Sequence, residues 1–354
     1  MTLAPSPELP TFSVDLAPLR RLVGASFPAS GGMLECQPMP GGASTRRYFR
    51  VRMVHRTAVA MFVPEGAKPE EIVSGDRPAG KWPFLEVREL LVSRGVDVPA
   101  LYGEDTERGW LLLEDLGDDT LAAVLLARAA SKVDLYVRAV TDLARAQAAL
   151  ADLPSSSVVA SRAFDENLLS WEIHHFREWA LEARGIALSE DDRRTFDHIA
   201  ERLARSIASL PRVFVHRDYQ SRNLMVRPGG GLCWLDFQDA LLGPRVYDLV
   251  ALLNDSYQVF DRPFLEARLD DYARIAGLGD EERTELGREF DRVTVQRKLK
   301  DAGRFVFVDR VKGNGSFLQF VEPTIAKARA SAARLPEDED MRALSQLLAR
   351  VLPR

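Results

Sequence analysis

Cysteine is scarce in this chain, and neither of its two cysteines suggests a metal site. Cys36 and Cys233 lie far apart, each within an apolar run, and neither has the spacing of metal ligands. We therefore expect both to be free thiols buried in the core.

Long apolar runs and an excess of one charge sign are also missing. No apolar run approaches the roughly 20 residues that span a bilayer, and the first dozen residues lack the features of a signal peptide. The net charge is −5, from 47 Lys and Arg against 52 Asp and Glu, and no basic face stands out. Membrane and nucleic-acid partners are therefore not expected. We expect a cytoplasmic protein that acts as a monomer.

The composition is that of an ordinary globular protein, with 46% hydrophobic and 28% charged residues. A length of 354 residues predicts two domains or one large bilobal unit.

The first third of the chain combines strand patterns with one inner helix. Apolar spacing predicts a helix over 15–27 and another over 82–95, which ends at Gly95. The expected strands lie at 34–39, 47–53 and 57–64, with two more around a turn in 98–117. Residues 65–81 are polar and rich in Gly and Pro, which favours a loop or mobile insertion. This pattern predicts a small, mostly antiparallel sheet over 30–114.

Long helical patterns dominate the rest of the chain. Helices are predicted at 133–150, 165–184, 190–209, 246–258, 263–276, 281–302, 317–333 and 338–352. Short strand-like pieces interrupt them at 212–216, 224–227 and 232–236.

The stretch "HRDYQSRN" carries the chemistry that stands out most. Asp218 and Asn223 lie on a polar loop between two apolar runs, and Asp236 follows at the end of the apolar stretch "CWLD". Phosphoryl transfer needs a carboxylate facing the attacking hydroxyl, and a carboxylate and carboxamide that hold Mg²⁺ on the nucleotide phosphates. The alternative is a hairpin whose turn contains Asp and Asn, both common in turns. The nearby strand-borne Asp236 favours the phosphotransfer interpretation.

These residues resemble the aminoglycoside phosphotransferase and choline kinase superfamily, whose members share a bilobal protein-kinase-like fold. The chain is most similar to the bacterial anomeric N-acetylmuramate/N-acetylglucosamine kinases of cell-wall sugar recycling. The similarity rests on the stretches 41–51, 84–87, 98–121, 216–226, 235–257 and 296–305. It implies an α+β fold with a small antiparallel-sheet N-lobe containing one helix (1–114), a hinge (115–118) and a larger, mostly helical C-lobe (119–354).

The resemblance also implies roles around the loop. Asp218 would be the catalytic base or orient the hydroxyl, and Asn223 and Asp236 would be the Mg²⁺ ligands. Asp248 would brace the loop by hydrogen bonds. Apart from the resemblance, we expect His216 to be a packed histidine that orients the loop, in preference to a role in acid/base chemistry.

On the nucleotide side, the resemblance makes "GGASTR" the loop that covers the ATP phosphates. Its candidate contacts are Gly41, Gly42, Ser44, Thr45 and Arg46, although a plain hairpin turn is the alternative. Backbone groups from Glu114 to Leu116 would meet the adenine, although Glu114 has the alternative of a helix cap in solvent.

One departure from the superfamily concerns the third strand, which usually carries a lysine that contacts phosphate. That strand reads "TAVAMFVP", with Met61 or a neighbour at the expected position. Arg46 or Arg47 are alternative cations. Glu86, the usual partner of this lysine, would then support the site, contact Mg²⁺ through water, or lie at the helix surface.

The acceptor is expected to be the anomeric hydroxyl of N-acetylmuramate or N-acetylglucosamine. Asp239 and Asn254 are candidates to bond sugar hydroxyls. A basic run on the 281–302 helix contains Arg297, Lys298, Lys300 and Arg304. Its ordinary interpretation is a solvated helix face. Its functional interpretation is that one of these cations, with Arg297 as the first candidate, meets the lactyl carboxylate. The alternatives are a kinase for another small alcohol, such as an aminoglycoside or choline, or a nucleotide-binding protein without activity.

Overall fold

The computed structural model describes residues 14–40, 46–64 and 82–353. The chain divides into two compact units, and each is described here by itself. The smaller unit comprises the described residues of Met1–Glu70 together with Pro99–Asp115, and the larger comprises those of Glu71–Val98 and Leu116–Arg354. The expected loop at 65–81 lies outside the described residues.

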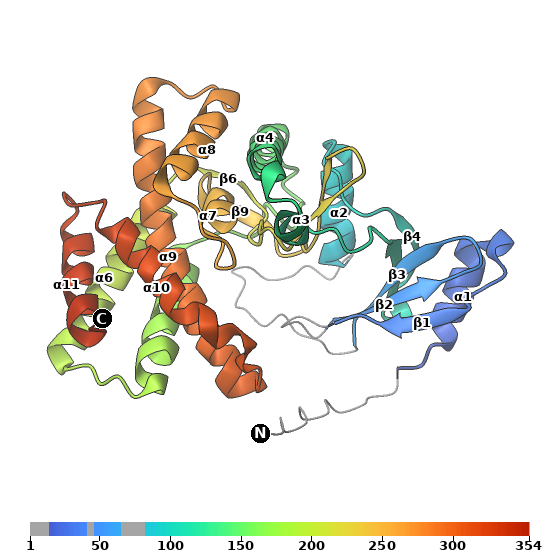
Figure 1. Ribbon diagram of the computed structural model, residues 1–354, viewed down its shortest axis with the longest axis horizontal. Helices are drawn as coiled ribbons and strands as arrows, with labels where there is room; N and C mark the ends of the chain where they lie inside the picture. The colour runs from blue at the N-terminus through green and yellow to red at the C-terminus, as the bar shows by residue number, and fades with distance from the viewer. Residues whose placement is uncertain (1–13, 41–45, 65–81, 354) are drawn as a thin grey trace. The chain divides into compact units, whose positions relative to one another are not determined.

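The smaller unit is a five-stranded antiparallel sheet with a helix packed on it (Figure 1). The strand order is β1-β2-β3-β5-β4, formed by β1 Glu35–Pro38, β2 Arg47–Arg52, β3 Thr57–Phe62, β4 Leu101–Asp105 and β5 Trp110–Glu114. Leu19 and Val23 of α1 (Ala17–Ser26) share one hydrophobic core with Val51 and Trp110 of the sheet. The mostly antiparallel sheet predicted from the sequence is therefore present.

Helix α2 (Pro83–Ser93) belongs to the larger unit. The Phe84 ring lies 4.9 Å from that of Phe237, and the guanidinium of Arg94 donates hydrogen bonds of 2.6 Å to the carbonyl oxygens of Ala149 and Asp152. The lobe boundaries expected from the sequence place this helix in the first lobe. Its described contacts instead join it to the helical unit.

The remaining helices build most of the larger unit (Figure 1). They are α3 Leu121–Ala127, α4 Lys132–Ala149, α5 Glu166–His175, α6 Glu190–Ala208, α7 Tyr247–Leu253, α8 Arg262–Ile275, α9 Asp280–Lys312, α10 Val321–Ala332 and α11 Glu339–Val351. Three differ clearly from expectation. The helix predicted over 165–184 changes to a π-helical turn at Phe176–Leu181, and α9 continues ten residues past the predicted end at 302. The helix predicted over 246–258 already ends at Leu253. The sequence analysis did not predict α3.

Two short antiparallel pairs frame the polar loop of the larger unit. Strand β6 (Arg212–Val215) pairs with β9 (Leu241–Pro244), which the sequence analysis missed, and β7 (Leu224–Val226) pairs with β8 (Leu232–Trp234). The strands on either side of the loop therefore belong to different pairs. The loop at 216–223 is a crossover between them and not a hairpin turn.

The two cysteines are free. Cys233 is buried as predicted, whereas Cys36 is only half-buried on the sheet. The described helices include none with the length and apolarity that crossing a membrane requires.

Candidate active site

The loop that follows β6 is held at its start by Asp248 of α7. Asp248 is fully buried, and its two carboxylate oxygens accept the backbone N–H groups of His216 at 2.6 Å and Arg217 at 3.0 Å. Arg217 has a φ of 80°, in the left-handed region that a long side chain rarely occupies. These two hydrogen bonds stabilise that conformation and are of the bracing kind expected of Asp248.

Four further hydrogen bonds fix the middle of the loop. Ser221 donates its backbone N–H and its hydroxyl to one oxygen of Asp255, at 3.2 and 2.5 Å. The Ser221 carbonyl accepts the N–H of Ala122 on α3, and the Tyr219 hydroxyl donates to the carbonyl of Ala139 on α4. Elements from three parts of the sequence therefore set the loop's path.

His216 is packed inside the loop and uncharged at neutral pH. Its ring lies 5.7 Å from those of Tyr219 and Trp234, and burial lowers its pKa to about 4. The neutral ring can therefore accept, and its Nδ1 takes the backbone N–H of Asp218 at 3.3 Å. This contact agrees with an orienting role for His216.

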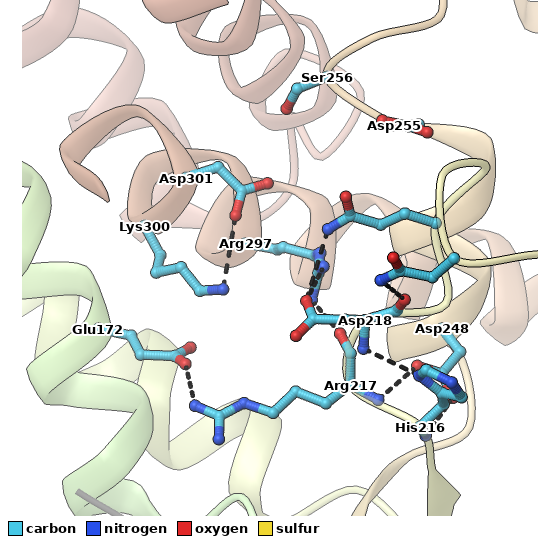
Figure 2. Close-up of polar contacts among 12 residues, drawn as sticks. Glu172, His216, Arg217, Asp218, Asp248, Asp255, Ser256, Arg297, Lys300 and Asp301 are labelled. Atoms are coloured by element: carbon cyan, nitrogen blue, oxygen red, sulfur yellow. Dashed lines mark hydrogen bonds and ion pairs between the residues drawn. The ribbon is translucent and has the colours of Figure 1, made fainter. Parts of the chain in front are cut away.

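Asp218 presents a partly exposed carboxylate that a buried arginine holds from behind (Figure 2). Its side chain is 37% exposed, whereas that of Arg297 has no exposed surface. Nη2 of Arg297 lies 3.3 Å from Oδ1 of Asp218, and Nη1 donates to the carbonyl of Arg217 at 2.8 Å. Burial by itself raises the pKa of Asp218, but the positive charges of Arg297, Lys300 and Arg217 outweigh it and hold this pKa below its ordinary value. Asp218 is therefore ionised at neutral pH.

The β7–β8 pair brings Asn223 and Asp236 to the same end of the two strands. Leu224 pairs with Trp234, and the next N–H along, that of Leu235, donates to the Asn223 carbonyl at 2.8 Å. Asn223 and Asp236 therefore flank the last rung of this ladder. Asp236 has a φ of 61°. In the described part of the chain, Arg217 and Asp236 are the only non-glycine residues with a positive φ.

The orientation of both side chains suits a hard cation. The Asn223 amide donates from Nδ2 to the Asp218 carbonyl at 2.9 Å, which leaves Oδ1 as an acceptor. Gln238 Nε2 donates to one Asp236 oxygen and to Asp239 Oδ2, each at 2.9 Å. Within the described ranges, no three His, Cys, Asp or Glu side chains group as a metal site. Two oxygen donors fit Mg²⁺, which takes its remaining ligands from water and phosphate.

Two of the predicted sugar contacts point elsewhere. Asn254 is buried and donates to the Thr294 hydroxyl at 3.0 Å, so its amide serves the packing of α7 on α9. Arg297 has no surface for a substrate and instead positions Asp218. Asp239 remains a candidate for a contact with a sugar hydroxyl. It is half-buried and accepts a hydrogen bond from Gln238.

The solvated-face interpretation of the basic run on α9 is wrong. Arg297 and Lys298 are buried, and the Lys300 side chain is 12% exposed. The run of basic residues alone predicted a helix face exposed to solvent. In the structure, the carboxylates of Asp218 and Asp301 pair with these cations inside the protein.

The predicted nucleotide-side residues are only partly described. Gly41, Gly42, Ser44 and Thr45 lie outside the described residues, and Arg46 directly precedes β2. The Glu114 carboxylate accepts the backbone N–H of Ala100 at 3.2 Å, and Leu116 is half-buried. The third strand carries no lysine, and Met61 there is buried.

The acid expected to pair with the missing lysine has another partner. Glu86 of α2 is half-buried, and its Oε1 accepts the backbone N–H of Val158 at 2.5 Å. It therefore ties α2 to the segment before α5 and does not simply lie at the helix surface.

The sequence analysis missed Glu172, which lies at the centre of the buried network. Glu172 on α5 has no exposed surface, accepts from Gln296 at 2.7 Å and lies 3.4 Å from Nη2 of Arg217. It shares the buried face of α5 with Leu168, Leu169 and Ile173. A glutamate within an apolar helical stripe was the available signal, because a buried charge needs a partner.

These features are those of a phosphotransferase, and comparison with known proteins agrees. The model of the phosphotransferase enzyme family matches residues 35–286, and the chain belongs to this family. Among curated proteins it is similar to the N-acetylmuramate/N-acetylglucosamine kinase of Pseudomonas aeruginosa, with 35% identity over 321 residues, 89% of this chain and 88% of that protein. The protein of the same name from Neisseria meningitidis is 33% identical over 275 residues, 74% of this chain and 75% of that one.

Solved structures confirm the predicted α+β, protein-kinase-like fold. Choline kinase LicA from Streptococcus pneumoniae aligns with a TM-score of 0.56 at 16% identity, over 90% of this chain and all (100%) of that one. The ADP-bound aminoglycoside phosphotransferase APH(2'')-Ib aligns with a TM-score of 0.53 at 13% identity, over 83% of this chain and 93% of that one. At such identities the likeness concerns the fold alone.

Proposed function

We propose that this protein transfers the γ-phosphoryl group of ATP to the anomeric hydroxyl of N-acetylmuramate or N-acetylglucosamine, giving the sugar 1-phosphate. The observation that carries the proposal is the loop itself. Asp218 is ionised and partly exposed, and Asn223, whose amide is bonded to the Asp218 carbonyl, flanks the same ladder rung as Asp236. The sugar is taken from relatives that are 33–35% identical and bear that name.

Asp218 would act mainly by orienting the acceptor. Its lowered pKa makes it a weak base, but an anomeric hydroxyl is more acidic than an ordinary alcohol and asks for little base strength. Phosphoryl transfer proceeds through a loose transition state in which positioning and charge stabilisation provide most of the catalysis. The bond from Arg297 fixes the carboxylate for this task.

Asn223 Oδ1 and the Asp236 carboxylate would hold Mg²⁺. The ion neutralises charge on the nucleotide phosphates. The positive φ of Asp236 directs its carboxylate from the strand end, and the bond from Gln238 limits its rotation.

ATP would be bound by Gly41, Gly42, Ser44, Thr45 and Arg46 at its phosphates. The backbone of 114–116 would contact the adenine. In the smaller unit, Arg50 of β2 forms an ion pair with Asp115. Its Nε lies 3.0 Å from Oδ2 and its Nη2 donates to Oδ1 at 3.1 Å. This two-point pair fixes the end of the segment proposed for adenine recognition.

An acceptor panel tests the proposal. ATP consumption is measured with N-acetylmuramate, N-acetylglucosamine, an aminoglycoside and choline, and the product is analysed by ³¹P NMR. We expect turnover with the N-acetylated sugars and a phosphate on carbon 1. Turnover only with the cationic alcohols would refute the proposed acceptor, and binding of ATP without any turnover would refute catalysis.

Asp218→Ala connects the activity to this loop. We expect a loss of about 10²–10⁴-fold in kcat, the range for a positioned acid–base group, with nucleotide binding retained in a calorimetric titration. Full turnover in this variant would overturn the role of Asp218.

A further inference from the structure

The buried cations of α9 differ in what they bind. Arg297 is engaged by Asp218 and by the Arg217 carbonyl. Lys298 donates to Asp301 Oδ2 at 2.7 Å and also lies 3.3 Å from the Ser256 hydroxyl. Both therefore have their bonding partners within the protein.

Lys300 does not. Its side chain is only 12% exposed, and it forms an ion pair with Asp301 Oδ1 at 3.5 Å. It makes no hydrogen bond to any residue in the described ranges, although an ammonium carries three donors. A nearly buried ammonium without hydrogen bonds is costly unless a partner completes it.

The ion pairs around Lys300 leave one positive charge over. Glu172 pairs with Arg217, Asp218 pairs with Arg297, and Asp301 is shared by Lys298 and Lys300. Each oxygen of Glu172 already has a partner, Arg217 for one and Gln296 for the other. An incoming anion would balance this group.

Lys300 lies on the side of α9 that faces Asp218. Residues three apart on a helix are neighbours, about 5–6 Å between their Cβ atoms, so Lys300 is one turn along from Arg297. Figure 2 shows its side chain extending from α9 toward the group formed by Glu172, Arg217 and Asp218. An anionic group carried by a substrate bound at Asp218 would therefore come within reach.

We infer that the Lys300 ammonium binds the carboxylate of an acidic acceptor sugar, the lactyl carboxylate of N-acetylmuramate. This inference rests on the proposed function. The lactyl group is attached at carbon 3 of the ring, and the phosphoryl group would be accepted at carbon 1. The carboxylate is thus separated from the reacting oxygen by the width of a pyranose. N-acetylglucosamine lacks this carboxylate, so Lys300 would set the preference between the two sugars.

The test removes the charge from each partner in turn. kcat/KM is measured for N-acetylmuramate, its methyl ester and N-acetylglucosamine, with the wild type, Lys300→Met and a control, Lys312→Met, at the exposed end of α9. For the wild type we expect a loss of about tenfold to hundredfold from acid to ester, the range for a charge-assisted hydrogen bond. In Lys300→Met the acid-to-ester ratio should fall close to one. In Lys312→Met it should stay as in the wild type.

The other outcomes overturn the inference. If the acid-to-ester ratio of kcat/KM is unchanged in Lys300→Met, another group binds the carboxylate. An equal loss on all three sugars, with the ratio kept, shows that Lys300 serves the phosphates or the packing. If the methionine variant does not fold, Lys300→Gln is measured by the same ratio, and Lys300→Arg should retain the preference for the acid. The acid-to-ester ratio tests only the role of Lys300. If the wild type is inactive on every N-acetyl sugar, the proposed function itself is refuted.

Discussion

Arg297→Met tests the most unusual feature of the site, a buried guanidinium behind the proposed catalytic carboxylate. Methionine preserves much of the apolar stem and removes the charge. The variant loses the bond from Nη1 to the Arg217 carbonyl and the contact from Nη2 to Asp218. It also loses the cation–π contact in which the guanidinium lies over the Tyr247 ring, 4.8 Å from the ring centroid.

The expected loss of stability follows from these contacts. The bond to the Arg217 carbonyl is buried and charge-assisted, which is worth about 1.5–3 kcal/mol. The contact with Asp218 adds less than about 1 kcal/mol, because that side chain is 37% exposed and solvent screens it. Removing one cation also relieves repulsion with Lys298 and Lys300, which opposes the loss. We therefore expect the free energy of unfolding to fall by about 2–3 kcal/mol, measured by urea denaturation.

The pH profile gives the second readout. Arg297 helps to keep the pKa of Asp218 below its ordinary value, so the carboxylate stays ionised until the pH falls through that low pKa. Without Arg297 the pKa rises, and activity should be lost at a higher pH on the acid side of the kcat/KM profile. The control is Arg310→Met, a 59% exposed side chain on the same helix. An unshifted acid limb in Arg297→Met would contradict the positioning role, even if stability fell.

Two further predictions concern the metal site and the packing of α9. Asp236→Ala should abolish the effect of Mg²⁺ on nucleotide affinity, as measured by titration with and without the ion, and an unchanged effect would count against a ligand role. Gly303→Ala should lower the free energy of unfolding by about 1–3 kcal/mol, because the added Cβ would lie 2.5 Å from the His175 carbonyl oxygen. Gly287→Ala on the same helix meets nothing within 4 Å and should instead gain about 0.5–1 kcal/mol. Equal effects of the two substitutions in urea denaturation would show that close approach is not the cause.

Local spacing was sufficient to predict the polar loop and to propose its oxygen donors. The distances in sequence from Asp218 to Asn223 and Asp236 are short, so one crossover and one strand pair can bring these side chains together. The sheet was equally readable, because β1, β2 and β3 follow one another closely in the chain and pair in that order. Strand β9 was missed because its sequence, "LLGP", contains Gly and Pro, which favour turns.

The partners of the loop could not be predicted in the same way. Asp218 and Arg297 are 79 residues apart, and Glu172 and Gln296 are 124 apart. Nothing in the local pattern of α9 distinguishes a cation that pairs inside the protein from one that faces water. The basic run therefore suggested a solvated face, and Arg297 was assigned to the substrate when its geometry assigns it to Asp218.

The arrangement around Asp218 bears on how strong a base this chemistry needs. A site built for strong general-base catalysis would place the carboxylate in an apolar setting, where burial raises its pKa. Here Arg297, Lys300 and Arg217 lower the pKa of Asp218 and weaken it as a base. Such a weak base is a disadvantage when the acceptor is an ordinary alcohol. It is sufficient for an anomeric hydroxyl, which gives up its proton more readily. The charges around Asp218 therefore favour an acidic hydroxyl as acceptor, in agreement with a sugar phosphorylated at carbon 1.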